Sequence, residues 1–117
     1  MSCHKIIAKE LLLLGFSPDH SGYRYIISGL DMSFDDETLL LGITYILYPA
    51  IAQKYDVSPS SVERSIRFAI QSAWKKGNLL QWQKYFGHDC QRPGNARFIA
   101  TMHEMLNVEE IEQYTLF

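Results

Sequence analysis

The stretch IAQKYDVSPSSVERSIRFAIQSAW, residues 51–74, carries the pattern that decides the fold. Ala52 is small and would let a second helix approach the first one closely. Asp56 belongs to the few residue types besides glycine that enter the left-handed backbone region at low cost, so it suits a tight turn. Val62 stands where a β-branched apolar side chain would anchor the second helix on the first. These offsets predict a helix-turn-helix.

The second helix of this motif has two candidate starting points. Ser58 can cap it, with Pro59 at the first helical position, where a missing N–H group has no cost. Ser60 followed by Glu63 also fits a capping box. The predicted start is therefore defined only to within about two residues.

Residues recur along this helix on two opposite faces. An apolar stripe at steps of three and four consists of Val62, Ile66, Ala69, Ile70, Ala73 and Trp74. A polar stripe on the other side consists of Ser60, Arg64, Arg67, Gln71 and Lys75. Arginine can bond a guanine edge with two donors, worth about 1–3 kcal/mol of discrimination per base. Together with the turn, this stripe favours a recognition helix at about residues 59–75 in the DNA major groove over a solvated face.

The composition suits one domain with one core. The chain has 117 residues, of which 47% are hydrophobic, and we expect a single domain over residues 1–117. The longest apolar run is too short to cross a membrane, and the first residues lack a secretory segment, so we expect a cytoplasmic protein without membrane contact. Cys3 and Cys90 are too few for a disulfide framework and should be reduced thiols.

The charge is distributed unevenly along the chain. The net charge is −2, which by itself argues against DNA binding. Residues 59–97, however, hold seven basic and two acidic residues, a balance of +5, whereas residues 98–117 hold four acidic residues and no basic one. The basic third contains the expected recognition helix, and a local basic face is what phosphate attraction requires.

The remaining chain reads as helices. Besides the recognition helix, which Gly77-Asn78 should end, we expect helices at residues 3–14, 20–34, 38–48, 49–55, 79–86 and 95–106. Pro49 should interrupt the third of these, Gly29 suits close helix packing, and residues 107–117 either extend the last helix or lie apart. The predicted fold class is all-α with about six helices and no strand. The expected core outside the motif consists of Ile6, Ile7, Leu11, Leu14, Tyr23, Ile26, Ile27, Leu30, Leu79, Trp82, Phe86, Phe98, Ile99, Met102 and Leu106.

Metal-binding and catalytic residues are sparse. The candidates are Cys3-His4 and His88-Asp89-Cys90, which lack the paired ligand spacing of a zinc site. His20 and His103 are isolated and should lie at the surface or at helix ends. No nucleophile paired with a base and no phosphate loop is visible. We therefore expect no metal, no cofactor and no catalytic site, and a protein that is not an enzyme.

Several longer segments resemble one family. They are GYRYI at 22–26, LGITYILYPAIAQKY at 41–55, SVERSIRFAIQSAWKKGN at 61–78 and NARFIATM at 95–102. With these segments the chain resembles the C-terminal DNA-binding effector domain of the stage-zero sporulation protein A, the response regulator of endospore-forming bacteria. The likeness runs from about residue 6 to residue 106 and is far more specific than a generic helix-turn-helix match.

The resemblance implies a six-helix domain of the helix-turn-helix and winged-helix-like group, without a β-wing, whose fourth helix reads a short DNA box. It implies that Glu63, Arg64 and Arg67 lie at the DNA. It also implies transcription regulation, a homodimer in tandem on paired boxes with the last two helices as contacts, and RNA polymerase as a further partner. We expect no counterpart of the family's receiver domain, with its phosphorylated aspartate, within these 117 residues, which are either a free-standing effector domain or a fragment of a longer response regulator.

Two departures from the family bear on the expected DNA-binding residues. Ser61 stands where relatives usually have a basic residue, and Phe68 where they often have histidine. Ser61 should lower affinity, while Phe68 could contact a thymine methyl group or a protein. The predicted DNA-binding residues are Ser60, Ser61, Glu63, Arg64, Arg67, Phe68, Gln71, Lys75 and Lys76. The structural alternatives are a capping box for Glu63, a surface ion pair for Arg67 and helix-end cations for Lys75 and Lys76. The alternative function is a protein-interaction module that keeps the fold without binding DNA.

Overall fold

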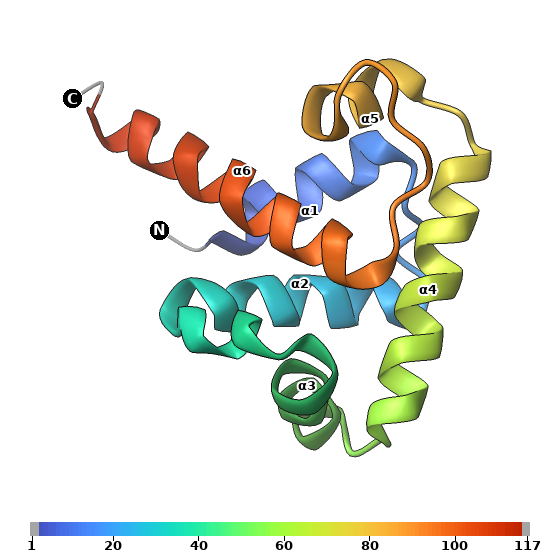
Figure 1. Ribbon diagram of the computed structural model, residues 1–117, viewed down its shortest axis with the longest axis vertical. Helices are drawn as coiled ribbons and strands as arrows, with labels where there is room; N and C mark the ends of the chain where they lie inside the picture. The colour runs from blue at the N-terminus through green and yellow to red at the C-terminus, as the bar shows by residue number, and fades with distance from the viewer. Residues whose placement is uncertain (1–2, 116–117) are drawn as a thin grey trace.

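Six α-helices make up most of the computed structural model, which describes residues 3–115 and the side chains of residues 4–107 (Figure 1). They are α1 (Cys3–Leu14), α2 (Ser21–Asp35), α3 (Tyr48–Tyr55), α4 (Pro59–Lys75), α5 (Leu79–Phe86) and α6 (Asn95–Thr115). No strand occurs within this part of the chain, so the all-α prediction with about six helices is confirmed. None of the described helices combines the length and the apolar character that a membrane span requires.

Helix α2 lies at the centre and crosses α4 at a glycine. A Cβ atom on Gly22 would lie 2.1 Å from the carbonyl oxygen of Ser65 and 2.8 Å from Cβ of Ala69. Because the nearest atom belongs to the backbone of α4, no side chain fits at this crossing. The close approach predicted for Gly29 exists too, since its Cβ would lie 2.9 Å from Cδ1 of Ile51, but there the neighbour is the end of a flexible side chain.

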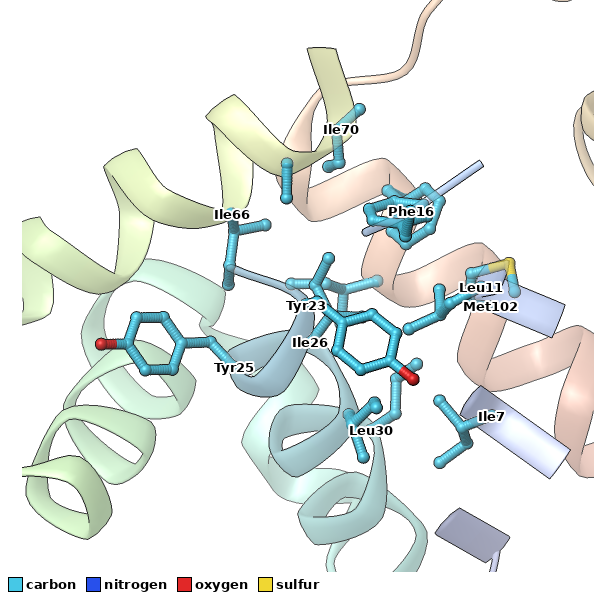
Figure 2. Close-up of a cluster of buried hydrophobic side chains, with 14 of the residues drawn as sticks. Ile7, Leu11, Phe16, Tyr23, Tyr25, Ile26, Leu30, Ile66, Ile70 and Met102 are labelled. Carbon is cyan, nitrogen blue, oxygen red and sulfur yellow. The ribbon is translucent and has the colours of Figure 1, made fainter. Parts of the chain in front are cut away.

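The core lies between α4 and the helices that pack against its buried face. Ile66 and Ile70 of α4 point toward Phe16, Ile26 and other buried side chains of the cluster (Figure 2). A second group of rings joins α5 and α6 to this cluster, with ring centroids 5.4–6.2 Å apart among Phe16, Trp82, Phe86 and Phe98. Burial of the apolar surface of these side chains supplies most of the driving force for folding.

Most of the predicted core is buried, with one clear error. Leu79 was expected to point inward, but half of its surface is exposed (51%). Trp82 takes the inward position of α5 instead, and its Nε1 donates to the carbonyl of Leu14 at 3.0 Å. Ile6 and Trp74 are half-buried at the edge of the core.

The segment before α3 differs from the predicted helix at residues 38–48. It consists of a 3₁₀ turn, η1 (Glu37–Leu41), and a π turn, η2 (Ile43–Leu47), separated by Gly42, whose φ of −154° and ψ of 89° are not helical. Asp36 accepts a hydrogen bond from the Thr38 N–H at 3.1 Å, which starts the first turn independently of α2. Leu41 (83% exposed) and Tyr45 (87% exposed) therefore face outward. The backbone becomes α-helical at Tyr48, next to Pro49, where the sequence predicted an interruption.

His103 was expected at the surface or at a helix end, and this prediction is wrong. The side chain is buried (4% exposed) in α6 and stacks on Phe34, with ring centroids 5.0 Å apart. Its Nδ1 lies 2.8 Å from Oγ of Ser33 and its Nε2 lies 3.3 Å from Oε1 of Glu37. Because both ring nitrogens have these hydrogen-bond partners, burial of the ring leaves neither of them unsatisfied. Helix α6 continues through residue 115, so the tail extends the helix; residues 116–117 lie outside the described part.

Candidate nucleic-acid interface

The helix-turn-helix has the predicted turn chemistry. Asp56 ends α3 in the left-handed conformation, with φ 56° and ψ 49°, and no other non-glycine residue in the described part of the chain has a positive φ. The N–H of Val57 donates to the carbonyl of Ala52 at 3.1 Å, which closes the turn. Ala52 and Val62 are buried between the two helices, as their offsets predicted.

Ser58 caps helix α4. Its Oγ accepts from the N–H of Ser61 at 3.1 Å, and Pro59 opens the helix. The alternative start, a capping box of Ser60 and Glu63, is wrong because Ser58 already holds the cap and the Glu63 side chain turns to the next helical turn instead. The cap contributes about 1 kcal/mol to helix stability and fixes where the outward face begins.

One side of α4 is buried in the protein and the other is exposed to solvent. The inward stripe is buried as predicted, apart from half-buried Trp74, and consists of Val62, Ile66, Ala69, Ile70 and Ala73. Of the nine predicted DNA-binding residues, the exposed ones are Ser60, Arg64, Arg67, Phe68, Lys75 and Lys76. The half-buried ones are Ser61, Glu63 and Gln71. The nine therefore all have solvent access.

Arg64 occupies the middle of the outward face. Its Nη2 lies 3.5 Å from Oγ of Ser61, a long hydrogen bond, and no ion pair of Arg64 occurs among residues 4–107. The hydroxyl of Ser61 is less available to a binding partner, because it also accepts a hydrogen bond from Oγ of Ser58 at 3.0 Å. The guanidinium of Arg64 is thus only weakly attached to its own helix.

Arg67 and Glu63 form an ion pair one turn apart on α4. Their side chains are 52% and 34% exposed, so the pair is a surface ion pair and contributes about 0.3–0.5 kcal/mol. Beneath it lies Tyr48, whose pKa is raised above its ordinary value of 10.0 by burial, with Glu63 adding to the rise and Asn95 and Arg67 opposing it. Tyr48 therefore stays neutral beside the pair. Because the exposed ion pair is weak, Arg67 can exchange its partner at little cost.

Phe68 and Lys76 also touch other elements. The ring of Phe68 is 56% exposed and lies against His20, which immediately precedes α2, with centroids 5.1 Å apart. Lys76 follows α4 and donates from Nζ to Oγ of Ser17 at 2.7 Å. Both contacts leave much of the side chain accessible to a partner.

A loop lies beside α4 on the flank opposite Phe68. Asn95, the first residue of α6, donates from Nδ2 to the backbone carbonyl of Glu63 at 2.9 Å. Arg92 lines a groove there together with Arg67 and Gln71. The sequence placed Arg92 only in the basic third of the chain, because helical periodicity does not reveal that a loop returns to a helix 25 residues earlier.

Of the candidate metal ligands, His4 and residues 88–90 are described, whereas the side chain of Cys3 lies outside the described part. Among the described residues, no three His, Cys, Asp or Glu side chains gather as metal ligands would. Cys90 is a free, half-buried thiol.

The sequence pattern of one protein family, described as sporulation initiation factor Spo0A C terminal, matches residues 7–106. The match spans more than four fifths of the chain and includes the whole helix-turn-helix, so the resemblance seen in the sequence segments is confirmed. The chain belongs to the family of Spo0A C-terminal domains, which are helical DNA-binding effector domains of transcription and are not enzymes.

Proposed function

We propose that this domain binds duplex DNA sequence-specifically, with α4 in the major groove, and so regulates transcription. The observation that carries the proposal is the outward stripe of α4, where Arg64 is exposed and weakly attached while the opposite stripe is buried. A rigid helix with an exposed, weakly attached guanidinium in its N-terminal half has the geometry that groove reading needs.

The residues of the outward stripe fall into two groups, those suited to contact base edges and those suited to contact phosphates. Arg64 suits a guanine edge, to which it can donate two hydrogen bonds. Glu63 can accept from a cytosine amino group once Arg67 leaves it for a base or a phosphate. The ring of Phe68 suits a thymine methyl group. Supporting polar and phosphate contacts would come from Ser60, Ser61, Gln71, Lys75 and Lys76.

The test begins with selection of preferred duplexes from a random pool. Binding of a selected and a scrambled duplex is then measured by fluorescence anisotropy over a series of salt concentrations. We expect a steep fall of affinity with salt and a preference for the selected sequence. If no duplex is retained at low ionic strength, the domain is instead a protein-interaction module, the reading that the net charge of −2 and exposed Phe68 favour.

Two substitutions separate the roles of the outward residues. Arg64→Ala should remove about 1–3 kcal/mol of discrimination at one base pair, because the guanine edge loses its two donors. Lys76→Ala should weaken binding to selected and scrambled duplexes alike, because a phosphate contact carries no sequence information. An equal loss of preference in both variants would show that the recognition helix is assigned wrongly.

The finer partner assignments belong to the same proposal. Tandem binding as a homodimer on paired boxes and contact with RNA polymerase are expected from the family likeness. Sedimentation of the complex on duplexes with one box and with two boxes measures the first, and transcription in a purified system measures the second.

A further inference from the structure

A groove runs along the flank of α4 that faces the start of α6. Its volume is about 290 Å³, and its walls include Arg67 and Gln71 of α4 and Arg92 of the loop before α6. Gln71 also belongs to the outward polar stripe of α4. The groove is therefore continuous with the face that we propose reads base edges.

The loop is held against α4 close to Arg92. Pro93, the next residue, is buried, and Asn95 bonds the carbonyl of Glu63 on α4 at 2.9 Å. Both residues lie within three positions of Arg92, and the hydrogen bond of Asn95 keeps this part of the loop beside α4. The side chain of Arg92 itself is exposed.

The groove carries an excess of positive charge. Glu63 is the one carboxylate in the described lining, and it is paired with Arg67. Arg92 has no ion pair within the described part of the chain. Two guanidinium groups against one carboxylate leave +1, and a guanidinium without a partner is suited to grip two oxygens of a phosphate.

We propose that Arg92 binds a backbone phosphate of the duplex while α4 reads the adjacent major groove. The inference rests on the proposed function and adds to it an attachment point outside the helix-turn-helix. Each side of the major groove is bounded by a sugar–phosphate backbone, and the loop lies on one side of α4. Such a contact sets the register of the helix on DNA without selecting a sequence, so Arg92 is a positioning residue.

A salt series on three variants tests the charge of Arg92. Arg92→Ala should flatten the plot of log affinity against log salt by about 0.9, the value for one phosphate contact, on selected and scrambled duplexes alike. The affinity ratio of wild type to variant should therefore shrink about 3.5-fold between about 50 and 200 mM salt. Arg92→Lys should keep the wild-type slope. The matched control is Lys9→Ala, which removes one exposed cation from α1 and should leave the slope unchanged.

Duplexes with single methylphosphonate linkages locate the contact. Each linkage replaces one charged phosphate by a neutral group. One position should weaken wild-type binding but have no effect on Arg92→Ala, while it still weakens Lys9→Ala. Thermal unfolding of each variant checks that the substitution leaves the fold intact.

The outcomes separate this inference from the proposed function. If the wild type retains no duplex at low salt, the proposed function fails. If the wild type binds with a preference that Arg64→Ala weakens, but Arg92→Ala keeps both the salt slope and every methylphosphonate effect, then only the role of Arg92 is wrong.

Discussion

The two faces of α4 are held by different kinds of contact. On the inward face Ile66 has no exposed surface and packs among side chains from several helices. On the outward face the hydrogen bonds of Arg64 and Arg67 run to Ser61 and Glu63, which lie on α4 itself. The inward contacts fix where the helix lies, and the outward groups stay available to exchange partners. Stability and DNA binding should therefore respond to separate sets of substitutions.

The largest effect should come from the inward face. Ile66→Ala should lower the free energy of unfolding by about 2–5 kcal/mol, because it leaves a cavity where α4 meets α2. Urea denaturation measures the change. Arg64→Ala, two residues earlier on the exposed face, is the control and should change stability by no more than about 0.5 kcal/mol. Similar losses in both variants would mean that the two faces are not distinct.

The crossing of α2 and α4 should be nearly as sensitive. Gly22→Ala places a methyl group against the backbone carbonyl of Ser65 and should cost about 1–3 kcal/mol or more, because one helix must move. Gly94→Ala is the matched control, since its added Cβ would meet no atom within 4 Å. A neutral result for Gly22→Ala in urea denaturation would show that the crossing is loose.

The smallest effect on stability should come from the outward ion pair. Glu63→Gln should cost only about 0.3–0.5 kcal/mol of unfolding free energy, because the pair is exposed. The same change should strengthen binding to a scrambled duplex, since it removes a negative charge and frees Arg67. Anisotropy on a scrambled duplex measures the gain. Weaker binding there would argue that the carboxylate keeps Arg67 in its binding geometry.

The parts of the fold that local chemistry determines could be predicted from the sequence. Asp56 and Ser58 act on their immediate neighbours, so the turn and the cap of α4 follow from a few residues. The segment at residues 37–47 was harder, because apolar side chains at steps of three and four fit a 3₁₀ and a π turn as well as an α-helix. Leu41 and Tyr45 consequently face outward despite their apolar character.

The remaining errors involve partners that are distant along the chain. His103 is buried because Ser33 and Glu37, more than 65 residues earlier, supply its hydrogen bonds. Arg92 lies beside α4 because Asn95 reaches a carbonyl 32 residues back. No period or spacing within one segment encodes such meetings. The outward stripe of α4 could be predicted, whereas the surface that flanks it needed the three-dimensional structure.

The hydrogen bond from Asn95 to α4 has a mechanical consequence. It attaches the first residue of α6 to α4, and α6 then runs away from α4 for 21 residues, about 30 Å (Figure 1). Phe98, Met102 and His103 of α6 are also buried in the core, so the helix is fixed along its first half and not only at Asn95. A displacement of α6 would therefore be transmitted to α4 through the shared core as well as through this hydrogen bond.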